Sequence, residues 1–205
     1  VGLLDCGLLL ASSPETWRFK GINDRNPQRI SVVLSFKYFA PPAPRVLYPP
    51  ERHMAMVENL YRHIGMAGHP LCGGAATENR HPSGTGKIET NLVDSENCAE
   101  IHVFHYGLET VHEVKKIIRH LCLRQVAAIQ LFLPLEDPLT ALMAEDMESL
   151  GFFFAGIFPL SDVGEALILQ YLNNVDIDYD KIILYTPTAG ELRDYVRAGD
   201  PFVAL

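Results

Sequence analysis

The sequence has few cysteines and none of the spacings that usually hold metals. Four cysteines occur, and no two of them form a Cys-x-x-Cys pair. Because a domain of this length can build its core without disulfides, we expect reduced thiols and a cytoplasmic protein. No HExxH motif is present. His102 and His105 lie three apart in an expected strand, where their side chains point to opposite faces, so we expect no metal site.

Basic residues and long apolar runs are also scarce. Lysine and arginine total 17 against 25 aspartates and glutamates, giving a formal net charge of −8. We therefore expect no nucleic-acid binding, which needs clustered positive charge. No apolar run approaches the roughly 20 residues that cross a bilayer, so no membrane association is expected. The chain begins at Val1 without a leader pattern, and the missing methionine suggests a fragment.

The composition is that of a globular protein, and its N-terminal part predicts two strands. Hydrophobic residues make up 48% of the chain and charged residues 20%. Residues 1–10 form an apolar run, and "RISVVLSFKYF" at 29–39 alternates, which predicts an antiparallel pair. The alternation predicts one apolar face, made of Ile30, Val32, Leu34, Phe36 and Tyr38. The prolines of "APPAPRVLYPP" predict a stiff linker at 40–50.

The rest of the chain alternates between helical and strand patterns. A Gly-rich loop is expected at 66–84, and "VAAIQLFLP" predicts a strand that is buried on both faces beside a parallel neighbour. The helix after this strand is expected to be capped by Asp137, with Glu148 on its outer side. The remaining predicted elements are a helix from about Pro50 to Gly65, a hairpin from 85–94 and 98–107, a helix from 111 to 123, a strand from Gly151, a returning strand at 165–172, a short strand at 181–185, and a helix opened by a Thr188–Glu191 capping box.

One pattern occurs twice. "VGLLDCGLLLASSP" at the start resembles "LGFFFAGIFPLSD" at 150–162, so that Gly2 and Gly7 correspond to Gly151 and Gly156. We expect Gly151 to end a helix and Gly156 to mark a bulge or a close backbone approach. The strands that follow, 29–39 and 165–172, also correspond. Residues 1–39 are thus predicted to be the closing hairpin of a preceding copy of the fold, and 51–205 the next domain.

The order of elements from residue 50, with "LGF" at 150–152 opening the penultimate strand, resembles the GNAT superfamily of acyl-CoA-dependent N-acetyltransferases over residues 46–174. The resemblance implies an α/β fold with a mixed, mostly antiparallel sheet flanked by helices. The segments around the linker and the C-terminus also look like the second half of bacterial proteins with two such domains, some of them behind an ATP-binding module of the anti-sigma-factor kinase type. An upstream GNAT-like domain is the partner that this implies.

The family's cofactor loop is incomplete in this sequence. Active members of the family hold the CoA pyrophosphate with a Q/R-x-x-G-x-G/A loop between the fourth strand and the next helix, where "HVFHYGLETVHEV" retains only Gly107. A Thr110–Glu113 capping box is expected to occupy the amides that a phosphate needs, and Glu109 adds repelling charge. The resemblance places a ligand-binding junction at six residues: Val103, Phe104, His105, Tyr106, Gly107 and Leu108.

The catalytic groups of the family are also hard to find. Many members place a tyrosine four residues before the glycine of "LGF" as the general acid, and Met147 stands there. Glu100 or His102 could act as a base through a water molecule. A lone histidine or glutamate in a strand is more commonly a surface or hydrogen-bonded structural residue, so both are weak candidates.

Three functions are compatible with these features. The first is a degenerate acetyltransferase-like domain without a cofactor, serving as an interaction or ligand-sensing module in a larger, regulatory bacterial protein. The second is an active N-acyltransferase that uses acetyl-CoA or another acyl-CoA, either through an atypical loop or in the upstream half. The third is a purely structural lobe. A protein partner or a homodimer fits each of them.

Overall fold

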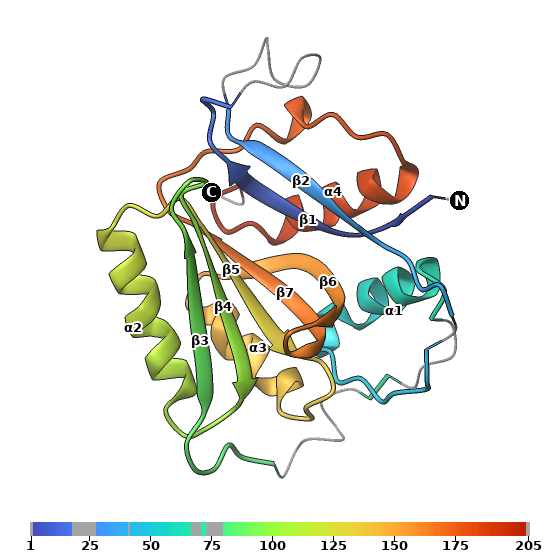
Figure 1. Cartoon of the computed structure of the whole chain (residues 1–205), viewed down its shortest axis with the longest axis vertical. Coiled ribbons are helices and arrows are strands. Elements are labelled where there is room, and N and C mark those ends of the chain that lie inside the picture. The colour runs from blue at the N-terminus through green and yellow to red at the C-terminus, as the bar shows by residue number, and fades with distance from the viewer. Residues whose placement is uncertain (1, 18–27, 41, 67–70, 73–79, 204–205) are drawn as a thin grey trace.

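The computed structural model describes residues 2–17, 28–40, 42–66, 71–72 and 80–203. These residues form one seven-stranded sheet in the order β2-β1-β6-β7-β5-β4-β3, flanked by four α-helices (Figure 1). Only β4 and β5 are parallel, so the predicted mixed, mostly antiparallel sheet is confirmed. The strands are β1 (Leu4–Ser13), β2 (Ile30–Phe36), β3 (Lys87–Val93), β4 (Cys98–His105), β5 (Ala128–Pro134), β6 (Phe153–Ser161) and β7 (Gly164–Leu172). The helices are α1 (Met54–His63), α2 (Thr110–Leu123), α3 (Thr140–Ser149) and α4 (Pro187–Gly199).

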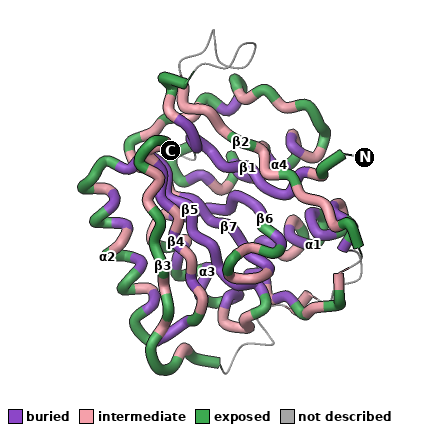
Figure 2. Tube along the Cα trace, viewed as in Figure 1, coloured by how far each residue is buried: buried purple, intermediate pink, exposed green. Residues whose placement is uncertain are grey.

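The centre of the sheet follows the hydrophobic pattern of the sequence. Every residue of β5 is buried, as its unbroken apolar run predicts, and β5 lies between parallel β4 and antiparallel β7. The predicted β3–β4 hairpin is also present. Figure 2 shows the central strands buried along most of their length, whereas β2 and β3 at the two margins are half-buried or exposed.

The helices share one core with one face of the sheet. This core includes alternate strand residues such as Leu131 and Leu167, together with residues from all four helices. On the other face, a smaller cluster contains strand residues alone, among them Leu9, Phe132 and Ile168. Among the described residues, no helix has the length and apolar character needed to cross a membrane.

The hairpins β1–β2 and β6–β7 carry the same irregularities at corresponding positions. In β1 the pairing skips a residue between Asp5 and Gly7, and in β6 it does so between Phe154 and Gly156. Further on, Ala11 and Leu160 both have left-handed backbones, with φ of 53° and 55°. The two hairpins meet where Gly7 pairs with Gly156. Corresponding strands thus face each other, as they would around a two-fold axis.

The two glycines of the motif "LGFFFAGIF" have the predicted structures. Gly151, with φ +100°, ends α3, and its N–H donates to the Glu148 carbonyl at 2.9 Å. Gly156 has φ +144°, and a Cβ atom on it would lie 2.3 Å from the Gly7 Cα. No residue with a side chain fits at this position without moving the neighbouring strand.

The proline-rich segment lies against the domain. Leu47 is fully buried and forms a bridge with Leu71. The Tyr48 N–H donates to the Leu135 carbonyl at 2.8 Å. The extended stretch expected at 40–50 is therefore held by the sheet where the structure describes it. Most of the loop expected at 66–84 lies outside the described residues.

The predicted strand at 181–185 is wrong. Tyr179–Lys181 forms a short 3₁₀ helix, and Ile183 and Tyr185 are exposed in an irregular segment. An apolar run becomes a strand only where a neighbouring strand offers hydrogen bonds, and none pairs with this segment in the described residues.

Two helix starts and one strand face also differ from expectation. Thr186 caps α4, rather than Thr188, because Pro187 occupies the first helical position. Helix α3 begins at Thr140, after a turn in which Asp137 accepts from the Leu139 N–H at 2.9 Å. Strand β2 has no fully buried face, and Val32 is 39% exposed because β2 is the outermost strand.

Candidate functional site

The predicted ligand-binding junction lies where β4 and β5 separate. The two strands pair from Cys98–Ala128 to His102–Phe132 and then stop pairing with each other, while β4 continues beside β3 and β5 beside β7. Tyr106, just beyond β4, is buried, and its hydroxyl lies 2.8 Å from Thr140 Oγ1. Thr140 donates in turn to the carbonyl of Pro134 at the end of β5. Tyr106 thus connects the separating strand ends, and burial raises its pKa well above the ordinary range.

The backbone amides of this junction are occupied by the protein's own acceptors. The Gly107 N–H donates to Thr110 Oγ1 at 2.8 Å, and the Leu108 N–H donates to the Gly84 carbonyl at 3.2 Å. Gly86 is packed so closely that a Cβ atom on Gly107 would lie 2.1 Å from its nitrogen. These amides therefore do not point into open space.

The capping box predicted at this junction is wrong in its partners. Thr110 is the first residue of α2 rather than its cap, so its hydroxyl accepts from Gly107 and not from Glu113. The Glu113 N–H donates to the Glu109 carbonyl at 2.8 Å. The predicted obstruction of a phosphate is unchanged, because the Gly107 amide, just after β4, still donates to an acceptor within the protein.

The two weak candidates for a general base lie on the face of the sheet away from the helices. His102 Nε2 is 3.4 Å from Glu100 Oε2. The His102 ring stacks on Phe132, with centroids 4.5 Å apart and planes 4° apart. His102 Nδ1 is buried without a hydrogen-bond partner in the described part of the chain. Nε2 and the carboxylate are therefore close enough for a long hydrogen bond.

The six junction residues do not form one surface. Val103 is fully buried in the core on the helical face. Phe104 lies under the Lys87 ammonium group, 4.2 Å from ring centroid to nitrogen. His105 is exposed, as is Leu108 at 70%. Tyr106 contacts Thr140, whereas Gly107 contacts Thr110 and packs against Gly86.

Met147, which stands where the resemblance would place a general acid, is fully buried in the core. A different set of polar residues lies beside it. His53 is buried, with Nε2 2.6 Å from Glu148 Oε1 and Nδ1 2.8 Å from the Tyr195 hydroxyl. Glu148 was expected on the outer side of α3 but is turned inward by this contact. This chain of groups joins α3, α4 and the turn before α1.

A second buried polar cluster surrounds Glu165. Its side chain is fully buried, and its carboxylate accepts from Tyr61 at 3.0 Å and from Tyr38 at 3.3 Å. Arg45 lies 3.8 Å away. Burial raises the pKa of Glu165, a change that the two tyrosines and the arginine partly offset. The sequence offers no signal for this cluster or for the His53 chain, because their members are far apart along it.

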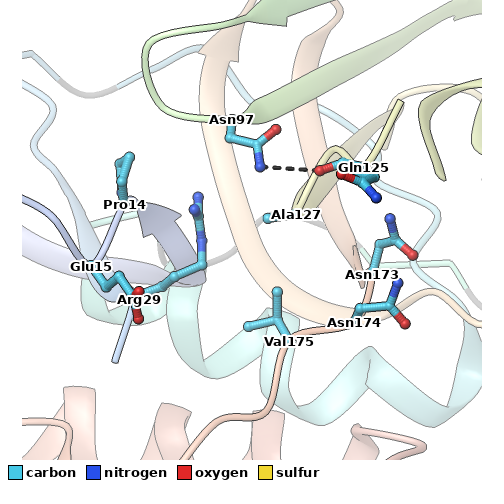
Figure 3. Close-up of a pocket in the computed structure, with 9 residues that line it drawn as sticks. All are labelled: Pro14, Glu15, Arg29, Asn97, Gln125, Ala127, Asn173, Asn174 and Val175. Atoms are coloured by element: carbon cyan, nitrogen blue, oxygen red, sulfur yellow. Dashed lines mark hydrogen bonds between the residues drawn. The ribbon is translucent and has the colours of Figure 1, made fainter. Parts of the chain in front are cut away.

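A pocket of about 370 Å³ lies at the opposite end of the sheet from Tyr106 (Figure 3). It adjoins the starts of β4 and β5, and four amide side chains help to line it. Figure 3 shows Arg29 on one side and most of these amides on the other. The lining residues are Pro14, Glu15, Arg29, Asn97, Gln125, Ala127, Asn173, Asn174 and Val175.

Arg29 is the only basic residue of this pocket lining. Its Nε donates to the Ala11 carbonyl at 2.9 Å, and its Nη2 to the Glu96 carbonyl at 2.6 Å. No carboxylate of the described residues lies within ion-pair distance of it. Asn97 and Gln125 have left-handed backbones, with φ of 52° and 58°. The pocket thus offers a fixed cation and amide groups, which suit a small anion, and the Glu15 carboxylate in its lining opposes one.

The comparisons with known proteins add no identity. No protein-family model and no curated protein matches the chain. Within the described residues, no three histidine, cysteine, aspartate or glutamate side chains gather as they would around a metal ion.

Proposed function

We propose that residues 51–205 form a GNAT-like domain that has lost acyl-CoA binding and serves as an interaction or ligand-sensing module. The larger protein is, on this proposal, a bacterial and regulatory one with an upstream GNAT-like domain. The strand order β3-β4-β5-β7-β6 supports the resemblance, as does the parallel β4–β5 pair that separates at one end. Loss of the acyl-CoA site accounts for the missing loop glycines and for Met147.

The observation that carries the proposal is the use of the junction amides by the protein itself. A pyrophosphate would have to displace the bonds from Gly107 to Thr110 and from Leu108 to Gly84. Each bond contributes about 1 kcal/mol net. Glu113 in the first turn of α2 also stabilises the unliganded helix start and repels a phosphate.

Calorimetric titration with acetyl-CoA and desulfo-CoA tests this loss of binding. We expect no heat of binding in the micromolar range for either compound. Thr110→Val removes the acceptor of the Gly107 amide but leaves the Gly84 contact, so it should not restore binding by itself. Micromolar binding by the unaltered chain would show that the cofactor site is open and would overturn the proposal.

The ligand-sensing part of the proposal depends on the Arg29 pocket, which we expect to take a small carboxylate or phosphate. Phosphate and succinate are suitable probes, because each presents oxygens that a guanidinium can bind. We expect either probe to raise the melting temperature of the protein, since a ligand that binds only the folded state stabilises it. Arg29→Gln should remove the increase. Arg62→Gln, on the exposed face of α1, is the matched control. An equal increase in both variants would exclude the pocket.

An active N-acyltransferase is the alternative, and the Glu100–His102 pair with its unpartnered Nδ1 favours it. In that case the upstream half would bind the acyl-CoA, and this domain would shape the acceptor site. Release of thiol from acetyl-CoA by the longer protein measures this activity. Loss of the release in His102→Phe would support the alternative over the non-catalytic module, provided that the control His112→Phe, on the exposed face of α2, retains it.

A further inference from the structure

The two outer strands of the sheet differ in how they are protected. β3 has the sequence KIETNLV, with charges at Lys87 and Glu89 that discourage pairing with another strand. β2 has the sequence ISVVLSF, with neither a charge nor a proline. An uncharged, β-branched edge of this length readily pairs with other chains, so natural sheets seldom leave one open.

An apolar groove runs along β2. It has a volume of about 350 Å³ and lies between β2 and the irregular segment that follows the Tyr179–Lys181 turn. Val32 is 39% exposed, Ile183 53% and Tyr185 84%. The residues that line the groove are Ser13, Ile30, Ser31, Val32, Val33, Ile183 and Tyr185. Val32, Ile183 and Tyr185 thus expose apolar surface beside the unpaired edge of β2.

The duplicated hairpin shows what kind of strand fits this edge. The order β2-β1-β6-β7 reads as two copies of one hairpin facing each other, with Gly7 opposite Gly156. Leu34 pairs with Gly7 as Ile168 pairs with Gly156, so β2 corresponds to β7. The other side of β7 is occupied by antiparallel β5, from Ala166 to Leu172. On β2 the corresponding stretch is 32–38, and its outer side pairs with no strand of the described residues.

We infer that the free edge of β2 binds an antiparallel apolar strand, in the position that β5 occupies beside β7. The strand is supplied by the upstream GNAT-like unit, so the identity of its supplier rests on the proposed function. The added strand should resemble β5, which is uncharged and buried on both faces. Main-chain hydrogen bonds to β2 supply affinity, and the groove selects apolar side chains.

A second copy of this chain fits the edge less well. Two β2 strands could pair with each other around a two-fold axis, but each would bring only its own half-buried hairpin. In this chain β5 is followed by α3 and preceded by α2, whose side chains complete the core on one face of the sheet. Only a strand that brings its own helices would bury Val33 of β2 to the same extent as its counterpart Leu167 in β7.

Hydrogen exchange of the 205-residue chain, with and without a peptide of the β5 sequence VAAIQLFLP flanked by lysines, tests this inference. We expect the peptide to slow exchange in β2 about tenfold, since amides that gain a strand partner become protected. β3 should not change and serves as the control edge. Val32→Lys should abolish the effect, and Ile183→Lys should weaken it from outside the strand. Leu123→Lys, at an exposed apolar position on α2, should leave it intact.

The other outcomes separate the remaining occupants. Absence of protection in β2, or equal protection in β3, would overturn the inference. Protection of β2 without peptide that rises with protein concentration, together with a dimer in sedimentation, would assign the edge to a second copy instead. The acetyl-CoA titration is independent of these results. If both the peptide and acetyl-CoA bind, only the proposed loss of the cofactor site is overturned. If neither binds, only the strand inference is overturned.

Discussion

The hairpins β1–β2 and β6–β7 share a backbone but differ in their surroundings. Both skip one residue before the central glycine, and both contain a left-handed residue near the end of the first strand, Ala11 or Leu160. Yet β7 is almost entirely buried, whereas β2 is half-exposed along its length. The path of a hairpin is thus set by its own residues, and its burial by the strands beside it.

Gly156→Ala should have the largest effect on this pair of hairpins. The new Cβ would lie 2.3 Å from the Gly7 Cα and 2.5 Å from the Cys6 carbonyl oxygen, at a φ of +144°. Crowding and backbone strain together should lower the free energy of unfolding by about 4 kcal/mol. Urea unfolding followed by circular dichroism measures the loss.

Gly7→Ala is the matched control for this prediction. The nearest atoms to its Cβ would be Leu34 Cδ1 at 3.1 Å and, at 3.4 Å each, the Ala155 carbonyl oxygen and Leu34 Cβ, so a small side-chain shift accommodates it. We expect a loss of about 1 kcal/mol. Equal losses of unfolding free energy in the two variants would contradict the structure, in which a Cβ is more crowded at Gly156 than at Gly7.

A lysine at corresponding positions of β7 and β2 should have unequal effects. Ala166 is fully buried, and Val32, its counterpart on β2, is 39% exposed. Ala166→Lys places a charge in the apolar cluster of Leu9, Phe132 and Ile168 and should cost about 3 kcal/mol. Val32→Lys leaves its ammonium group in water and should cost less than about 0.5 kcal/mol. Thermal unfolding of the two variants gives the comparison, and similar losses would indicate that β2 is covered in solution.

The sequence predicts most of the fold where one residue type allows only one local structure. The unbroken apolar run of β5 allows a strand buried on both faces, and Gly151 and Gly156 mark a helix end and a close approach. Prediction fails where a neighbour decides. The apolar run at 181–185 resembles a strand but pairs with none in the described part of the chain. Pro187 is the local signal that would have placed the cap of α4 at Thr186.

The candidate sites were less predictable from the sequence for the same reason. His53, Glu148 and Tyr195 are far apart along the chain, so the sequence does not indicate their contact. The contact forms only because α3, α4 and the turn before α1 pack together. Thr110 illustrates a partial success. Its hydroxyl was expected to occupy an amide at the start of α2, and it does, but the amide belongs to Gly107 because the helix begins one residue earlier than a cap at Thr110 requires.

Glu165 distinguishes β7 from β2 by its charge, since Ser31 is its counterpart. Burial raises the pKa of Glu165 above its ordinary value of 4.5. The folded protein therefore binds a proton more tightly than the unfolded chain, so this carboxyl contributes most stability below about pH 4.5 and loses it as the pH rises through the folded pKa. Glu165→Gln removes the titration. The free energy of unfolding of the unaltered protein, relative to this variant, should fall with rising pH above that value.

The control for Glu165 is an equivalent change at an exposed carboxylate. Glu58→Gln on α1 breaks only a surface ion pair with Arg62, so its effect on stability should vary little over the same pH range. Urea unfolding at several pH values measures both variants. If the free energy of unfolding of the unaltered protein, relative to Glu165→Gln, instead rose with pH, the hydrogen bonds from Tyr38 and Tyr61 would outweigh the burial of the charge.

The smallest expected effect concerns the left-handed residues that the hairpins share. Leu160 is 58% exposed, so Leu160→Gly removes backbone strain while giving up little packing. The freer unfolded chain offsets part of this gain, and we expect an increase of about 0.5 kcal/mol in the free energy of unfolding. Ala11→Gly relieves the same strain but loses a fully buried methyl group, so its net effect should be about zero.

Leu108→Gly, at an exposed position without a left-handed backbone, should instead lower stability. If urea unfolding gave Leu160→Gly the same loss as Leu108→Gly, the left-handed turn would not be strained, and its recurrence in the two hairpins would reflect the strand geometry alone.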